Sequence, residues 1–148
     1  MADFTLSPAK EADFERLPEL KNTVQRPHLQ RVGRFEPQRS RDKFRAGFER
    51  SEMRLIHVEG AFAGCIGLTR AEGVVEVENF YIAQEFQGNG LGGAVMRAVM
   101  DEAREDGVQL KLTVLVDSPA NRFYQRLGFV EVGRTEIDVF YRLRDEQA

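Results

Sequence analysis

The spacing of hydrophobic residues changes several times along the chain, and each change marks an expected element. Apolar and polar residues alternate over Phe4–Pro8, which predicts a strand. Apolar residues recur at helical spacing over Ala9–Leu20 and again over 37–50, where Pro37 suits the first turn of a helix. The stretch between these helices, Asn22–Pro37, contains Pro27 and a glycine, and we expect it to be irregular.

The middle of the chain predicts a three-stranded meander. Two β-like runs, Met53–Val58 and Ala61–Thr69, are joined by Glu59-Gly60, a two-residue turn whose glycine can adopt positive φ. A second glycine turn then leads into Val74–Ile82. We expect these three runs to pair as consecutive antiparallel strands.

A helix and a buried strand follow the meander. Apolar residues at helical spacing predict a helix over Ala94–Asp106, and Gly107 would end it. Leu110–Val116 is strongly apolar, as is typical of a strand inside a sheet. Because a strand, a helix and a strand in this order imply a right-handed crossover, Val74–Ile82 and Leu110–Val116 should pair in parallel.

The C-terminal part predicts a short helix and two further strands. Asp117-Ser118-Pro119 is a helix cap with proline at the first position, and it would open a helix over Ala120–Leu127. Phe129–Gly133 and Ile137–Leu143 form the last strand pair. The order β-α-α-β-β-β-α-β-α-β-β indicates a mixed α/β sheet with helices on both faces. We expect a single domain over 1–148, with a flexible tail at 144–148.

Composition and charge narrow the class of protein. The net charge of -3 divides into +6 over residues 21–50, from nine basic residues and three acids, and -9 elsewhere. The basic stretch has few aromatic residues and the chain is acidic overall, which argues against a nucleic acid partner. No run approaches the roughly 18 apolar residues of a membrane span, and the N-terminus lacks the pattern of a leader. We therefore expect a cytoplasmic protein without a membrane partner.

The single cysteine and the two histidines offer little chemistry by themselves. Cys65 is the only cysteine, so no intrachain disulfide is possible, which fits a reducing compartment. It lies in an apolar run, and we expect a small core residue rather than a nucleophile. His28 is expected in an exposed loop and His57 on the outer face of a strand, and neither has a partner at metal-ligand spacing. No metal site is expected.

The most distinctive local pattern is a glycine-rich turn between a strand and a helix. Such a turn can hold phosphate, because free backbone N–H groups and the helix dipole converge there. The run Gly88-Asn89-Gly90-Leu91-Gly92-Gly93 satisfies G-x-G-x-x-G, and Asp117 could stand as the ribose-binding acid of a dinucleotide fold. However, five residues separate Ile82 from the first glycine, a meander precedes the turn, and only 31 residues follow Asp117. A dinucleotide-binding fold needs a second mononucleotide-binding half after this acid, and the remaining residues are too few to form it. We therefore do not favour this interpretation.

A second interpretation of the turn begins one residue earlier. Gln87-x-x-Gly90-x-Gly92, after a strand and a five-residue loop, resembles the pyrophosphate motif of the GNAT superfamily of acyl-CoA-dependent N-acyltransferases. Downstream, Ser118–Phe129 resembles the other family motif, with its Phe-Tyr-x-x-Leu-Gly-Phe ending. The similarity is good over about 52–132 and holds only in outline for the N-terminal helices. It implies a GNAT-like, mostly antiparallel sheet with a central splayed pair of parallel strands.

The resemblance also implies a cofactor and the residues that hold it. The cofactor would be acetyl-CoA, whose pantetheine arm adds to the end of the strand Val74–Ile82. Where the family often has an asparagine at the start of the second-motif helix, this chain has Asp117 and Ser118, with Asn121 one turn later. Arg122 and Arg126 could contact nucleotide phosphates. The expected cofactor-binding residues are Phe80, Ile82, Gln87, Gly88, Asn89, Gly90, Leu91, Gly92, Gly93 and Asn121.

Acetyl transfer to an amine needs a base, because an alkylamine with a pKa of about 10.4 is protonated near neutral pH. Glu76 and Glu78 lie two residues apart on the strand before the turn, so they should face the same side, and each carboxylate should raise the pKa of the other. The family uses acids at either kind of position, and we favour Glu78 over Glu76. Tyr124 matches the family tyrosine that protonates the departing thiolate. A backbone N–H near Phe80–Ile82 would stabilise the oxyanion.

The expected activity is N-acetyl transfer from acetyl-CoA to a primary amine in a ternary complex. The alternative is a non-catalytic acyl-CoA sensor or interaction module that keeps the glycine turn. The acceptor could be a small molecule or a peptide: the two glutamates suit a cationic amine, whereas the basic stretch suits an acidic one. A homodimer could form through the edge of the last strand pair.

Overall fold

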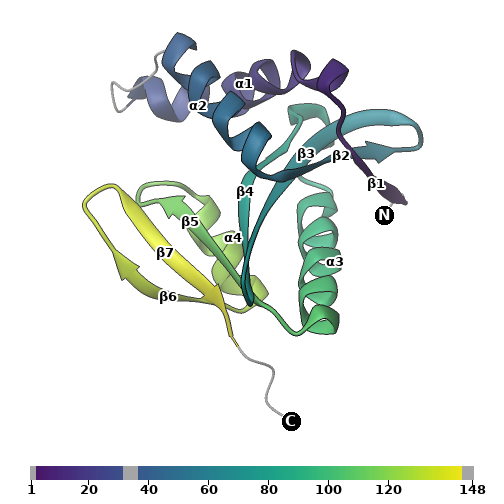
Figure 1. Ribbon diagram of the computed structural model, residues 1–148. Coiled ribbons are helices and arrows are strands. Elements are labelled where there is room, and N and C mark those ends of the chain that lie inside the picture. Colours follow the sequence, from purple (N-terminus) through teal and green to yellow (C-terminus); the bar gives the residue numbers. More distant parts are fainter. Residues whose placement is uncertain (1–2, 32–36, 145–148) are drawn as a thin grey trace. The chain divides into compact units, whose positions relative to one another are not determined.

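The computed structural model describes residues 3–31 and 37–144, and the side chains from 38 to 144 and from 3 to 25. The chain forms two compact units. The first comprises 1–69 and 78–92, and the second comprises 70–77 and 93–148. The elements, labelled in Figure 1, are β1 (Phe4–Pro8), the 3-10 turn η1 (Glu11–Asp13), α1 (Arg16–Arg31), α2 (Pro37–Arg50), β2 (Glu52–Val58), β3 (Ala61–Ala71), β4 (Val74–Ile82), η2 (Gln84–Phe86), α3 (Leu91–Asp106), β5 (Gln109–Leu115), α4 (Ala120–Leu127), β6 (Phe129–Arg134) and β7 (Asp138–Leu143).

The order of strands and α-helices is the predicted one, and hydrogen bonds link the strands in the order β1-β2-β3-β4-β5-β7-β6. β1 with β2, β2 with β3, β5 with β7 and β6 with β7 are antiparallel. β4 and β5 are parallel, with Val74–Val77 in register with Gln109–Leu112, which confirms the predicted crossover. The sheet is therefore mixed and mostly antiparallel, as the sequence indicates.

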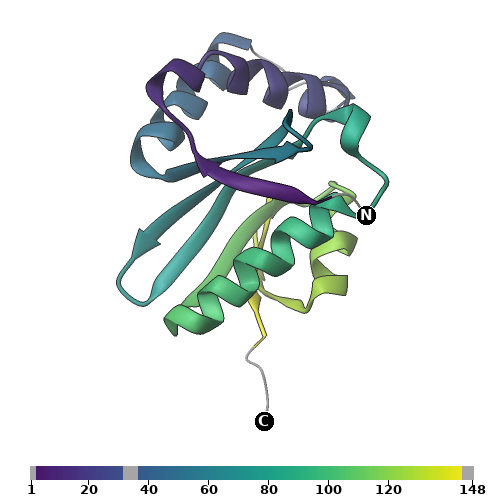
Figure 2. The ribbon, with the colours of Figure 1, turned by 90° about the vertical axis from the view of Figure 1, so that its right-hand side faces the viewer.

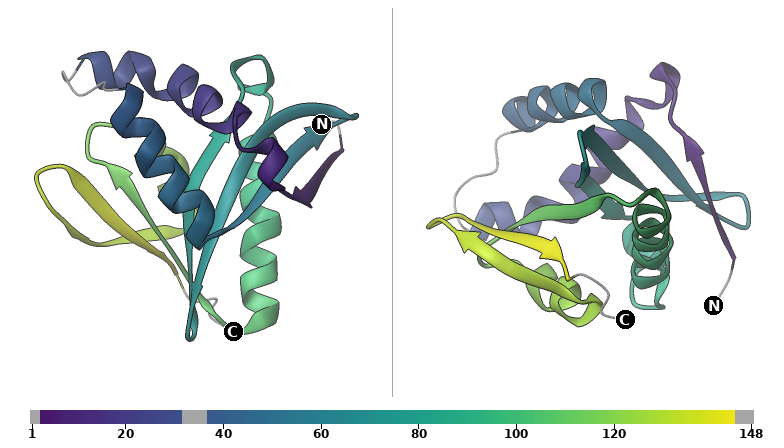
Figure 3. Two further views of the ribbon diagram at one scale, coloured as in Figure 1. Left: turned by 45° about the horizontal axis from the view of Figure 1, so that its top comes forward. Right: turned by 60° about the horizontal axis from the view of Figure 1, so that its bottom comes forward.

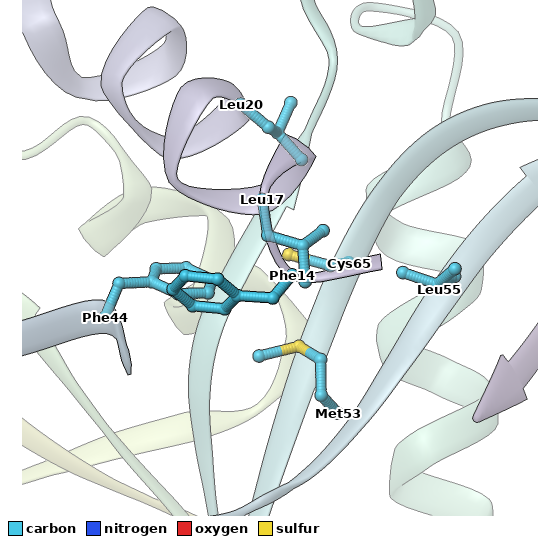
Figure 4. Close-up of a cluster of buried hydrophobic side chains, with 7 residues drawn as sticks. All are labelled: Phe14, Leu17, Leu20, Phe44, Met53, Leu55 and Cys65. Atoms are coloured by element: carbon cyan, nitrogen blue, oxygen red, sulfur yellow. The ribbon is translucent and has the colours of Figure 1, made fainter. Parts of the chain in front are cut away.

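The core of the first unit forms where α1 and α2 pack against β2 and β3. Figure 2 shows β1 running along β2, with which it pairs over its whole length. Figure 4 shows the rings of Phe14 and Phe44 beside each other, with Met53 below them. The centres of these two rings are 6.2 Å apart. The buried cluster comprises Phe14, Leu17, Leu20, Phe44, Met53, Leu55 and Cys65.

The second unit holds the hairpin of β6 and β7, with β5 beside β7 and α4 against β5 and β6 (Figure 3). Gly128 ends α4 at φ +103°, a left-handed conformation that favours glycine. Helix α3 buries a stripe at helical spacing that includes Val95, Val99 and Ala103. Arg70 of β3 and Glu102 of α3 form an ion pair at 3.2 Å.

The N-terminal helices differ from the sequence-based expectation. The stretch Asn22–Pro37, expected to be irregular, is helical as far as Arg31, so Pro27 lies inside α1 and removes one helix hydrogen bond. Pro18 lies in the first turn of α1, where its missing N–H removes no helix hydrogen bond, and burial of Leu17 and Leu20 anchors this half of the helix in the core. The expected start of the same helix at Ala9 is instead the separate turn η1.

Candidate active site

The glycine turn joins β4 to α3 through η2, and its backbone adopts the conformation that its glycines predict. Gly88 has φ +81° and Gly90 has φ +87°, both in the left-handed region. The Asn89 side-chain oxygen accepts a hydrogen bond from the N–H of Leu91 at 3.2 Å, and so caps α3. The next amides of α3, at Gly92 and Gly93, have no partner within the helix because they belong to its first turn. They can therefore donate to an anion.

Side chains around the turn are mostly solvent-facing. Gln87 is exposed, and its amide nitrogen donates to the Ile82 carbonyl at 2.8 Å, which ties the turn to the end of β4. A Cβ on Gly93 would lie 3.2 Å from the guanidinium of Arg97, so this arginine lies over the first turn of α3. Sequence reasoning missed Arg97. The sequence could have indicated this position, because Arg97 comes four residues after Gly93 and therefore lies on the same face of α3.

The end of β4 departs from regular strand geometry. Asn79 has φ +49°, and the alternation of buried and exposed residues along β4 stops after Val77. Asparagine is among the few residues that tolerate this conformation. On the neighbouring strand, a Cβ at Gly64 would lie 2.1 Å from the Tyr81 carbonyl oxygen. Only glycine therefore lets β4 approach β3 this closely just before the turn.

Phe80 and Ile82 lie in this irregular part of β4, and both are partly buried. Tyr81, between them, packs against the core cluster of the first unit, and its ring centre is 6.5 Å from that of Phe44.

Glu78 is held by two partners of the first unit. Its carboxylate forms an ion pair with Arg50 of α2 and accepts a hydrogen bond from the Thr69 hydroxyl of β3. Burial raises the pKa of Glu78, but the hydrogen bonds from Arg50 and Thr69 outweigh it, so its pKa lies below the usual value. The expected elevation of this pKa by Glu76 was therefore wrong, because sequence reasoning did not place an arginine beside Glu78.

Glu76 is placed differently. It is partly buried and stands opposite Lys111 in the register of β4 and β5. Among the residues that the structure describes, no side chain forms an ion pair or hydrogen bond with its carboxylate. Of the two candidate bases, Glu76 is the one whose carboxylate remains available.

Tyr124 lies in the second unit, on α4, and is 8% exposed. Its ring packs edge-on against Phe123 and Phe129, with ring centres 5.0 and 5.6 Å away. Burial raises the pKa of its hydroxyl. The phenol is therefore protonated throughout the neutral range, which is the form that can donate a proton.

Asn121 is engaged within the protein. Its amide nitrogen donates to the carbonyls of Leu115 and Ser118 at 3.0 and 2.8 Å, and its oxygen accepts from the Tyr141 hydroxyl at 2.7 Å. These bonds fasten the loop between β5 and α4. The predicted cap of α4 was wrong: the helix begins at Ala120, so Pro119 is its N-cap residue and not its first helical residue, and no side chain caps it. The Ser118 hydroxyl accepts a hydrogen bond from the N–H of Ala120 at 3.1 Å.

The other sequence candidates supply no further chemistry. Cys65 is fully buried, as expected, and burial raises the pKa of its thiol to about 12. The His57 ring packs on Phe62, whereas the side chain of His28 lies outside the described residues. Arg122 and Arg126 are exposed on α4. Within residues 3–31 and 37–144 we find neither a three-residue group that could hold a metal ion nor a helix with the length and apolarity of a membrane span.

Comparison with known proteins places this geometry in a family. The model of the acetyltransferase (GNAT) domain matches residues 23–140. No sequence among the curated proteins matches the chain significantly. One similar solved structure is that of a PaiA N-acetyltransferase of Thermoplasma acidophilum with coenzyme A. Its sequence is 14% identical, its TM-score is 0.78, and the match covers 97% of this chain and 99% of that one. A GNAT acetyltransferase of Elizabethkingia anophelis with acetyl-CoA bound has 16% identity, a TM-score of 0.70 and coverage of 95% and 97%.

A chimeric spermidine N-acetyltransferase from Vibrio cholerae is also similar, with 17% identity, a TM-score of 0.72 and coverage of 95% and 94%. At these identities the solved structures support the fold, whereas the domain model covers most of the sequence. The mixed, mostly antiparallel sheet agrees with both. The chain therefore belongs to the GNAT family of acetyltransferases.

Proposed function

We propose that the protein transfers an acetyl group from acetyl-CoA to a primary amine, by direct attack of the amine in a ternary complex. The observation that carries this proposal is the turn Gln87–Gly92, whose two left-handed glycines lead into the unpaired amides of α3. Coenzyme A or acetyl-CoA is bound to two of the similar structures. The acceptor is a small molecule or a peptide amine.

The cofactor's pyrophosphate would bind to the backbone amides of Gln87–Gly93, including those of Asn89 and Leu91. Arg97 would add a positive charge over the same helix turn. The pantetheine arm would pair with the backbone of Phe80 and Ile82. Asn121 would act by fixing the loop before α4, since its own amide is engaged with that loop.

The base would be one of the acids of β4. Glu76 has the free carboxylate, whereas Glu78 is neutralised by Arg50 and its lowered pKa makes it a weaker proton acceptor. We therefore propose Glu76 as the general base and Glu78 as the group that holds Arg50 against β4. Tyr124, whose phenol is protonated near neutral pH, would return a proton to the departing thiolate.

Variants of the two acids separate these roles. Glu76→Gln should lower kcat at neutral pH by about 100-fold or more, the usual size of a general-base contribution, with partial rescue at high pH where the amine is already neutral. Glu78→Gln should lower the melting temperature more than kcat, because it removes the negative charge from the ion pair with Arg50. Glu72→Gln, in an exposed turn, is the matched control. A larger loss of kcat in Glu78→Gln than in Glu76→Gln would reverse the assignment.

One observation favours the alternative, an acyl-CoA sensor without catalysis. The ion pair of Glu78 removes one of the two acids that a base could come from. Calorimetry with acetyl-CoA, run beside a transfer assay over a panel of amines, distinguishes the two functions. Tight binding with no transfer to any amine would favour the sensor.

A further inference from the structure

Lys21 of α1 is a charged side chain in the core of the first unit. It is only 8% exposed, and no other described polar or charged residue is as buried. Its ammonium lies 5.8 Å from the centre of the Phe44 ring. No carboxylate among the described residues forms an ion pair with it. A buried cation without a counter-charge is unfavourable, so the folded protein retains it at a cost in stability.

The surroundings of Lys21 are built by both N-terminal helices. α2 packs against α1, and the Ser40 hydroxyl donates to the Asn22 side-chain oxygen at 3.1 Å, next to Lys21 in sequence. Lys43 of α2 lies close enough for its charge to disfavour the ammonium form of Lys21. Two helices therefore bring a second positive charge, rather than a carboxylate, towards Lys21.

Aromatic rings connect this cation to the end of β4. Phe44, under the ammonium of Lys21, packs against Tyr81, which lies between Phe80 and Ile82. All of these residues belong to the first unit. The cation thus lies near the strand segment to which we assign the pantetheine arm, on the side of the core where α1 and α2 meet.

The partners of Glu78 and Lys21 bear on the two acceptor classes that the sequence leaves open. The carboxylate of Glu78, which could attract a cationic acceptor, is already neutralised by Arg50. The positive charge of Lys21 has no such partner among the described residues, so an anionic ligand could neutralise it.

We propose that the acceptor amine carries a carboxylate or a phosphate, and that Lys21 binds this anionic group, with the ring of Phe44 as the apolar floor beneath it. The inference rests on the proposed acetyl transfer. A methionine would fill the same space without an unpaired charge, so substitution by methionine separates the charge of Lys21 from its packing.

The first experiment measures acceptor preference with the full chain and acetyl-CoA. The acceptor pairs are phenylalanine with phenethylamine, and phosphoethanolamine with ethanolamine, so the two arms distinguish carboxylate from phosphate. In the wild type and in Lys21→Met, kcat/KM for the anionic acceptor is divided by kcat/KM for its neutral partner. For one of the two pairs this ratio should be at least about tenfold lower in Lys21→Met, which is the effect expected from losing one charge-assisted hydrogen bond. Because the wild-type ratio is divided by the variant ratio, the intrinsic reactivity of each amine cancels. Lys10→Met, which changes an exposed lysine next to η1, should leave the ratio unchanged.

The second experiment does not depend on turnover. Titration of the protein with phenylalanine or phosphoethanolamine, followed by NMR of the lysine side chains, should move the resonance that is missing from Lys21→Met. Acetyl-CoA binding with no transfer to any amine would overturn the proposed function, while this titration would still report on the anion site. An unmoved Lys21 resonance, or a preference ratio that survives Lys21→Met, would overturn the inference even if acetyl transfer is shown.

Discussion

At the residue scale, two acids on β4 show how the side chains around a carboxylate determine its chemical role. Glu76 and Glu78 are equivalent by spacing, yet Glu78 is bound by Arg50 and Thr69 whereas Glu76 has no partner in the described part of the chain. The sequence predicts that both lie on one strand, and β4 confirms it. It does not predict the ion pair, because Arg50 is 28 residues away and meets Glu78 only through the packing of α2.

Tyr124→Phe tests the proposed acid. Removing the hydroxyl should lower kcat by about 100-fold, while the dissociation constant for acetyl-CoA changes little, because the ring still packs between Phe123 and Phe129. Stopped-flow or steady-state release of CoA measures the first quantity, and calorimetry the second. Tyr141→Phe, which loses the hydrogen bond to Asn121, is the comparison and should lower kcat much less, because its hydroxyl only helps to fix the loop before α4. Unchanged turnover in Tyr124→Phe would remove this residue from the mechanism.

Lys21→Met should make the protein more stable at neutral pH. Burial lowers the pKa of Lys21 from 10.5 to about 8, so the unfolded chain binds more protons than the folded one between these pH values. The penalty is therefore fully present at pH 7, shrinks as the pH rises above about 8, and is absent above about 10.5. Denaturant unfolding at pH 7 should show a gain of up to roughly 3 kcal/mol, from 1.36 kcal/mol per pKa unit.

The same comparison at pH 10.5 and above should show almost no difference between the variant and the wild type. A gain that does not depend on pH would mean that packing, and not the charge, limits stability at this position.

At the scale of elements, the close approach of β3 to β4 depends on a single missing Cβ. Gly64→Ala would place that atom 2.1 Å from the Tyr81 carbonyl oxygen, so the strands must separate, at a cost of about 3 kcal/mol or more. Gly133→Ala on β6 is the matched control, since its Cβ would meet Phe140 at an ordinary 3.6 Å. Thermal unfolding should show a large loss for the first variant and a small change for the second. Equal effects would show that the contact at Gly64 is not what constrains β4.

The glycine turn can be tested with two glycine-to-alanine variants that should cause the same backbone strain. Gly88 in the turn and Gly60 in the β2–β3 hairpin have φ +81° and +82°, and a Cβ at either would have no atom within 4 Å. Each alanine variant should therefore lose about 1–2 kcal/mol of stability through backbone strain. Only Gly88→Ala should also weaken acetyl-CoA binding, by about tenfold, because the turn must hold the pyrophosphate. Equal affinities of the two variants for acetyl-CoA would argue against binding of the pyrophosphate by this turn.

At the scale of the whole molecule, the local patterns predict most of the architecture. Alternation and helical spacing give β2 to β7 and α2 to α4 within a few residues, because these segments carry their own caps, turns and glycines. α1 is the exception. Its prolines predict an early end of the helix, but Leu17 and Leu20 pack in the core and the helix continues to Arg31. Contacts between distant segments, such as Arg50 with Glu78 and Asn121 with Tyr141, cannot be read from periodicity.

The two compact units share β3, β4 and α3, each of which begins in one unit and ends in the other. Because no linker separates the units, we predict that the chain unfolds as one domain. Calorimetry should give a single transition whose calorimetric and van't Hoff enthalpies agree. Two resolved transitions would show that the units are separate domains.

The most direct test of the central claim is acetyl transfer itself. The purified chain is incubated with acetyl-CoA and a panel of amines that includes amino acids, polyamines, aminoglycosides and peptides, and acetylated products are detected by mass spectrometry. We predict a product that gains one acetyl group on its amine, releases one equivalent of CoA, and forms at least about 100 times more slowly with Glu76→Gln at neutral pH. Acetyl-CoA binding without any acetylated amine, or a product that forms equally fast with the variant, would contradict the account.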